Sequence, residues 1–295
     1  MTKTVIIPQV FRLNAIDRFT REIVDNNGRP TDQDYIFDFS RLSFIDGSGY
    51  TVLSNTIAWL KFHRAKIKIV KIDGANRPGI QYLDDCGFFR STLQKTLRGD
   101  AAIRSTTIPC TSVENAKAFS WIEHKLSPWL EYELNTNYAS LASLRSAVKE
   151  LFNNIGDHSA QQTGFVHAQH YPNVREIRIT VSDFGVGIPT TIKNRFGDMS
   201  DAHAITLAAR EGVTSQSRPN NMGAGLNYLI DSVTGDRGSV VIHSLSGSLV
   251  CNDEGGRQVR REATTRGSYP GTLVEIALDT RLFEGDDDER GDVEW

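Results

Sequence analysis

Three polar residues, Glu150, Asn154 and His158, recur every four positions in a segment with helical periodicity. In an α-helix of about 3.6 residues per turn, this spacing places them on one ridge. A carboxylate, an amide and an imidazole would then lie beside the apolar stripe that faces the core, where a ligand cleft can form. A solvated helix face is the alternative interpretation, and it is the commoner one for polar residues. The predicted stripe consists of Leu141, Leu144, Val148, Leu151, Phe152 and Ile155.

Asp183 follows a predicted strand, and Gly185 and Gly187 come shortly after it in the segment SDFGVGIP. Glycines at alternate positions allow the backbone to approach a ligand closely or to adopt positive φ. A carboxylate at the end of a strand can accept a hydrogen bond from an exocyclic amine. A tight turn without a ligand is the alternative interpretation of this short motif.

Two further glycine motifs follow along the chain. Gly223 and Gly225 begin a predicted helix in the segment NNMGAGLNYLI. The free amide groups and the positive dipole at the start of a helix favour a bound anion such as phosphate, whereas an ordinary helix start is the alternative. The last motif is Gly271 and Thr272, which begin the closing predicted strand.

In this order, the four motifs resemble the N, G1, G2 and final Gly-Thr boxes of the GHKL ATPase superfamily, which includes gyrase and histidine kinases. The resemblance covers about residues 138–278, and residues 211–217 look like the mobile ATP lid of that superfamily. It implies a Bergerat-type α/β sandwich with a mixed sheet. It also implies that the chain binds ATP and Mg²⁺, although such pockets serve kinases and ATPases alike.

The resemblance implies a role for each matching position. Asn154 would bind Mg²⁺ through its amide oxygen, a ligand suited to a hard cation. Glu150 would polarise the attacking water in hydrolysing members, and Asp183 would hold the adenine amino group. A ligand on this side of the helix explains why poor helix formers occur within it. The other implied ATP-binding residues are Asn153, His158, Gly185, Gly187, Gly223, Gly225, Leu226 and Thr272.

The N-terminal part of the sequence alternates predicted strands and helices, which indicates an α/β domain. Its segment FDFSRLSFIDGSGYTVL resembles the signature of STAS domains, the anti-sigma-factor antagonist family, with Asp46, Ser48 and Gly49 at the turn. That resemblance implies Ser48 as a candidate phospho-acceptor, because a helix N-terminus stabilises added negative charge. An ordinary serine at a helix start is the alternative interpretation.

The patterns divide the chain into three parts. We predict a STAS-like domain over residues 1–105, a GHKL-like domain with a leading helix over residues 106–282, and an acidic, disordered tail over residues 283–295. A helix over residues 114–126 is predicted to end before Pro128. The other predicted helices cover residues 13–26, 48–64, 78–89, 138–159, 201–212 and 223–235, and residues 185–222 are otherwise predicted as loop. Strands are predicted over residues 4–8, 34–40, 66–72, 164–171 and 176–183, and in three pieces between residues 238 and 278.

Composition and charge exclude several classes of protein. The net charge of -3 over 295 residues gives no basic excess for a nucleic-acid surface. The sequence has no apolar run long enough for a transmembrane helix and no signal-peptide region. Its three scattered cysteines favour buried apolar positions, and His167 and His170 fall on opposite faces of a predicted strand. We therefore expect a cytoplasmic protein without membrane or nucleic-acid partners.

The combined motifs favour a regulatory protein in which Mg-ATP binding controls the STAS-like domain or a protein partner. One alternative is a serine/threonine kinase of the anti-sigma type. Others are an ATPase whose lid closure drives homodimerisation and a nucleotide sensor without turnover. A sensor histidine kinase is disfavoured, because His124 is not followed by the acidic residue of a phospho-acceptor motif.

Overall fold

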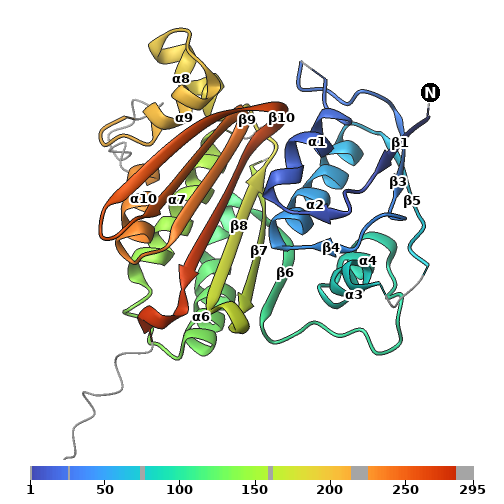
Figure 1. Cartoon of the computed structure of the whole chain (residues 1–295), viewed down its shortest axis with the longest axis horizontal. Helices are drawn as coiled ribbons and strands as arrows, with labels where there is room; N and C mark the ends of the chain where they lie inside the picture. The colour runs from blue at the N-terminus through green and yellow to red at the C-terminus, as the bar shows by residue number, and fades with distance from the viewer. Residues whose placement is uncertain (1, 26, 74–76, 159–161, 214–224, 284–295) are drawn as a thin grey trace, which may run out of the picture.

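The computed structural model describes residues 2–25, 27–73, 77–158, 162–213 and 225–283. Figure 1 shows a small sheet with its helices on one side of a large, twisted sheet, and a second group of helices on the other side of that sheet. Helices and strands thus form a layered α/β arrangement, as the sequence predicts. None of the described helices is both long and apolar enough to cross a membrane.

The N-terminal part is built around a parallel sheet of three strands. Its elements are β1 (Thr2–Ile6), β2 (Val10–Phe11), α1 (Ile16–Arg21), β3 (Asp34–Asp38), β4 (Phe44–Ile45), α2 (Gly47–Phe62), β5 (Lys66–Val70), α3 (Pro78–Asp85) and α4 (Phe88–Leu93). The sheet order is β1-β3-β5, and the short strands β2 and β4 pair separately. Phe19 of α1 packs close to Phe11 and Phe37, with ring centroids 4.8 and 6.2 Å away, so aromatic rings fill this core.

The C-terminal part is built around a sheet of five strands. These are β6 (Thr107–Glu114), β7 (Thr163–Tyr171), β8 (Glu176–Asp183), β9 (Ser239–Asp253) and β10 (Gln258–Asp279). Their order is β6-β7-β8-β10-β9, and every pairing within the described residues is antiparallel. The predicted mixed sheet is therefore wrong. The short connections from β7 to β8 and from β9 to β10 reverse the chain direction, which makes those neighbours antiparallel.

The helices of the C-terminal part differ from the sequence prediction in two places. They are α5 (Asn115–Trp121), a π-helical turn (Ile122–Leu126), α6 (Ser127–Leu134), α7 (Ala142–His158), α8 (Ile188–Phe196), α9 (Asp201–Ala208) and α10 (Gly225–Gly235). The predicted helix end before Pro128 is wrong, because Leu126 and Ser127 keep helical backbone angles and Pro128 lies in the first turn of α6, directly after the π-helical turn. Helix α8, predicted as loop, has Pro189 at the same kind of position.

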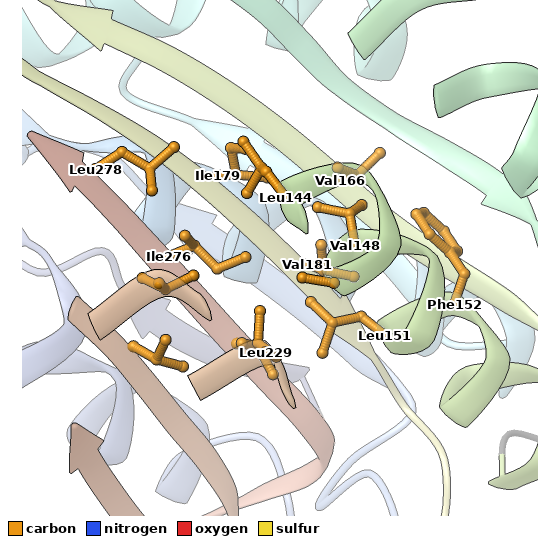
Figure 2. Packing of buried hydrophobic residues seen from close by; sticks show 14 of the residues in the cluster. Leu144, Val148, Leu151, Phe152, Val166, Ile179, Val181, Leu229, Ile276 and Leu278 are labelled. Carbon is orange, nitrogen blue, oxygen red and sulfur yellow. The ribbon is translucent and has the colours of Figure 1, made fainter. Parts of the chain in front are cut away.

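The core of the C-terminal part lies between the large sheet and the helices α7 and α10 (Figure 2). All six residues of the predicted apolar stripe are buried, five of them on α7 and Leu141 directly before it, which confirms that part of the prediction. Ile179 and Val181 of β8 and Ile276 of β10 meet this stripe. Since side chains alternate along a strand, Thr180 and Ser182 of β8 point to the opposite face of the sheet.

Helix α2 covers that opposite face and belongs to both parts of the molecule. It begins after Asp46, whose Oδ1 accepts a hydrogen bond from the Gly49 amide at 3.0 Å, which satisfies one free amide of the first turn. Nearly the whole helix is buried, including polar residues such as Asn55. A helix buried on several sides needs cover from more than one layer. Here β4 and β5 lie on one side, and β7 and β8 lie on the other.

Candidate functional site

Asp183 and Thr272 are directly opposite each other in the sheet. They are partners in the antiparallel register of β8 and β10, although they are far apart in the sequence. Asp183 lies two residues after Val181, so its side chain points to the α7 face. The carboxylate is buried, and its Oδ1 accepts a hydrogen bond from the Gly185 amide at 2.6 Å. Burial raises the pKa of Asp183 to about 7, and hydrogen bonds from the amides of Gly185 and Thr272 oppose that rise.

The backbone after Asp183 packs closely against the start of the Thr272 segment. Gly187 has a φ of +82°, and a Cβ on Gly271 (φ of +97°) would lie 2.3 Å from the Asp183 carbonyl oxygen. A side chain at either position is therefore strained. Ser244 of β9 joins these segments: its Oγ donates to the Gly271 carbonyl at 2.6 Å and accepts from the Ile188 amide at 3.0 Å. The sequence gives no signal for this role of Ser244.

Glu150, Asn153 and Asn154 lie together on α7, outside the buried stripe. Glu150 and Asn153 are half-buried, and Asn153 Nδ2 donates to Glu150 Oε1 at 3.3 Å. Asn154 is exposed. A Cβ on Gly225, the first residue of α10, would lie 3.0 Å from Glu150 Oε2. The carboxylate therefore lies against the start of α10.

The α7 residues and Asp183 are at the same end of the large sheet. A Cβ on Gly164 would lie 2.6 Å from Ile155 Cδ1 and 3.7 Å from the Ser182 carbonyl oxygen. Ile155 follows Asn154 on α7, and Ser182 precedes Asp183 on β8. The end of α7 thus crosses the sheet where β8 ends, and the predicted residues of both motifs gather there.

Other predicted site residues are outside this cluster or outside the described residues. The Leu226 side chain is buried in the core together with Leu229, so only the backbone of Leu226 is left for the predicted contact with phosphate. His158 is the last residue of α7, and its side chain lies outside the described residues, as do Gly223 and most of the predicted lid over residues 211–217. The predicted tail likewise lies outside them, apart from residue 283.

His167 and His170 point to opposite faces of β7, as predicted. His167 Nδ1 is 2.7 Å from the Ile108 carbonyl oxygen, and its ring packs on Tyr50 of α2. His170 contacts Glu133 of α6. Two of the cysteines, Cys86 and Cys251, are buried, as the sequence suggests. Because both histidines are bonded to residues outside the candidate site, neither of them belongs to it.

Ser48, the candidate phospho-acceptor, is fully buried between the two parts of the molecule. Its hydroxyl donates to Glu275 of β10, whose side chain points away from the α7 core. Two cations lie beside this cluster. Arg178 Nη1 is 3.9 Å from Asp46 Oδ2 and 4.0 Å from Glu275 Oε1, and Arg12 Nε is 3.9 Å from Asp46 Oδ2. In this docked arrangement no phosphate donor can reach Ser48.

Glu275 makes the contact between the two parts sensitive to pH. Burial raises its pKa from 4.5 to about 7. Attraction to Arg178 opposes this rise, and repulsion from Asp46 and Glu176 adds to it. The contribution of Glu275 to the free energy of unfolding is therefore fully present below pH 4.5, where the carboxyl group is protonated, and is lost as the pH rises through about 7.

We therefore expect Glu275→Gln to stabilise the protein by about 2 kcal/mol at pH 8 and to have little effect at pH 4.5. The figure follows from about 1.4 kcal/mol per unit of pKa shift, reduced to allow for residual solvent screening. Urea unfolding at both pH values measures this difference. Glu114→Gln, at an exposed residue that ends β6, is the control and is expected to change neither value. An equal change at both pH values would contradict titration of Glu275 as the cause.

No protein-family model and no curated protein matches the chain. Among solved structures, it is similar to the ATPase region of topoisomerase II from Saccharomyces cerevisiae bound to ICRF-187 (dexrazoxane), with 15% sequence identity and a TM-score of 0.23. The match covers 38% of this chain and 31% of that chain. At this TM-score the likeness defines neither a family nor a shared site.

Proposed function

We propose that the C-terminal part is a GHKL-like domain that binds Mg-ATP at the end of β8. The pairing of Asp183 with Thr272 carries this proposal, because it unites two of the four motifs that the resemblance assigns to one pocket. The contact between Glu150 and Gly225 unites the other two. Both pairs lie on the face of the sheet that α7 covers.

The surroundings of Asp183 suit an adenine ring. Its buried carboxylate is held by backbone amides, and a buried charge gains stability from each added hydrogen-bond donor. The exocyclic amine of adenine is such a donor. Gly185 and Gly187 shape the backbone beside the carboxylate, and Thr272 lies opposite it. These features support recognition of adenine in preference to guanine, which presents a carbonyl oxygen at that position.

The surroundings of Glu150 suit the phosphate end of the nucleotide. Gly225 begins α10, whose first amides and dipole favour an anion. Asn154 is exposed, so its amide oxygen is accessible to Mg²⁺. The described residues contain no group of three or more His, Cys, Asp or Glu side chains that could hold a metal ion. Magnesium would therefore depend on Asn154, phosphate oxygens and water, a set of oxygen ligands that this ion accepts.

Bound Mg-ATP would supply the phosphoryl group, and Glu150 would orient a water molecule and accept its proton. We expect Glu150→Gln to lower phosphate release at least about 100-fold, because general-base catalysis contributes roughly that much or more. Glutamine keeps an oxygen for Asn153 to bond, so ADP affinity should stay within about threefold.

The measurement is a coupled phosphate-release assay under ATP saturation, with Glu262→Gln, an exposed residue of β10, as the control. The control is expected to match wild type. If wild type releases no phosphate, or if Glu150→Gln releases it at the same rate, Glu150 is not the general base.

We further propose that the N-terminal part is a STAS-like domain that responds to the nucleotide through its docking on the large sheet. Its parallel sheet and the Asp46-capped helix α2 support this assignment. Burial of Ser48 against Glu275 favours regulation by docking over phosphorylation of this serine in the docked state. Nucleotide binding would then set how firmly α2 is held.

Calorimetric titration of the full chain with ADP and ATP, with and without Mg²⁺, tests the proposed function. We expect dissociation constants on the order of 1–100 μM, within the range in which enzymes commonly bind substrates. Magnesium should strengthen ATP binding, and GDP should bind more weakly than ADP. Absence of binding by any adenine nucleotide to folded protein would exclude the proposed function.

A further inference from the structure

Asn55 of α2 forms a buried hydrogen-bond triad with two residues of the large sheet. Its Nδ2 donates to Ser182 Oγ at 2.7 Å and lies 3.3 Å from the Tyr269 hydroxyl, and Ser182 and Tyr269 also bond to each other. The exposed fractions of Asn55, Ser182 and Tyr269 are 4%, 1% and 2%, so water does not compete for these bonds. Buried polar groups that satisfy one another in this way fix the relative position of their backbones.

The triad lies directly behind the candidate nucleotide site. Ser182 precedes Asp183 on β8, and Tyr269 lies two residues before Gly271 on β10. Because successive side chains of a strand point to opposite faces, Ser182 faces α2 while Asp183 faces α7. The same short piece of backbone therefore carries a bond to the N-terminal part and the proposed adenine-binding carboxylate.

A second contact links α2 to the residue on the other side of Asp183. The Phe184 ring packs against Trp59 of α2, with centroids 5.3 Å apart, and against Tyr269 at 5.3 Å. Trp59 and Tyr269 are buried. Asp183 is thus flanked by Ser182 and Phe184, and both neighbours are anchored to α2.

We propose that Asn55 and Trp59 are positioning residues for nucleotide binding, through which the N-terminal part holds the Asp183–Gly187 turn in its binding geometry. This inference rests on the proposed function. Neither residue touches the nucleotide; both act through the backbone of β8. Coupling between binding sites is reciprocal, so a bound nucleotide tightens the docking of α2, and undocking of α2 weakens nucleotide binding.

The variant Asn55→Leu tests this inference, since leucine has a similar volume but cannot donate a hydrogen bond. Thr20→Val is the matched control, because Thr20 is also buried in the N-terminal part and its hydroxyl bonds within α1, to the Ile16 carbonyl at 3.0 Å. Tyr269→Phe, which removes one hydroxyl of the triad, is the second variant in case Asn55→Leu does not fold. All are made in the full chain.

Two measurements are compared. The first is amide hydrogen exchange of residues 183–187 without nucleotide, which we expect to be about tenfold faster in Asn55→Leu and unchanged in Thr20→Val. The second is ADP affinity by calorimetry, which we expect to fall about 5- to 20-fold in Asn55→Leu, a coupling of ordinary size between sites. The ratio of ADP to GDP affinity should fall as well, which a general loss of stability would not cause.

The two measurements separate the failure of this inference from the failure of the proposed function. Unchanged exchange at residues 183–187 overturns the positioning role, whatever the affinities are. Faster exchange with unchanged ADP affinity and unchanged selectivity also overturns it. If wild type binds no adenine nucleotide, the proposed function fails, and the positioning role in nucleotide binding fails with it. Amide hydrogen exchange at residues 183–187 still shows whether α2 holds the turn.

Discussion

Replacing Asp183 by asparagine is expected to weaken ADP binding by about 10- to 100-fold. A hydrogen bond to a charged acceptor is worth roughly 1.5–3 kcal/mol, and each 1.4 kcal/mol corresponds to a factor of ten. Asparagine also places an NH₂ group where the carboxylate accepts from the amides of Gly185 and Thr272. Either the adenine amine or a backbone amide then meets a second donor. Calorimetry with ADP and GDP measures the effect, and GDP affinity should change much less.

The control for this change is Asp236→Asn, an exposed carboxylate just after α10. It should leave ADP affinity within about twofold, as surface substitutions away from a site usually do. Wild-type ADP affinity should also rise between pH 6 and pH 8, because the pKa of Asp183 is about 7 and the ionised form is the stronger acceptor. Equal loss of ADP and GDP affinity in Asp183→Asn would show that the carboxylate does not contact the adenine base.

The second large effect is expected at Ser48. The change Ser48→Asp introduces a third carboxylate beside Glu275 and Asp46, which already pair with the nearby cations Arg178 and Arg12. An unpaired buried charge costs about 3–5 kcal/mol. We expect the variant to lose about that much of its free energy of unfolding or to separate its two parts, with a larger radius of gyration in X-ray scattering. Phosphate on Ser48 would add still more negative charge.

Two further variants distinguish charge repulsion from loss of packing. Ser48→Ala removes one hydrogen bond to a carboxylate and should cost only about 1–3 kcal/mol. The double change Ser48→Asp with Glu275→Gln should recover part of the stability, as a double-mutant cycle between contacting residues requires. If Ser48→Asp is as stable as wild type, the close docking of α2 on β10 does not exist in solution.

Parts of the fold could be predicted because their signals are local. The stripe on α7 follows from helical periodicity, and the range of β8, residues 176–183, was predicted without error. Helix α8 was missed because the glycines before it and the proline in its first turn resemble a loop. The antiparallel sheet was missed because strand direction depends on pairing, which no single segment specifies.

The candidate site divides in the same way. Glu150, Asn154 and Asp183 could be proposed because the order of the four motifs resembles that of the GHKL superfamily, and because poor helix formers in a helical segment indicate a ligand side. Their spatial grouping depends on how α7 packs across the end of β8, which the order of the motifs does not specify. The roles of Ser244 and Asn55 depend on contacts between distant segments, and these residue types occur equally in ordinary strands and helices.

The core of the N-terminal part includes Tyr269 and Leu273 from β10, so the two parts have no separate interiors on this side. A gene split between them would yield two polypeptides, each with a bare hydrophobic side. Such fragments would tend to aggregate unless they associated with each other. Residues on the two sides of this shared core must change together in evolution, because neither part keeps its apolar side covered without the other. Natural truncations between the two parts should therefore be rare.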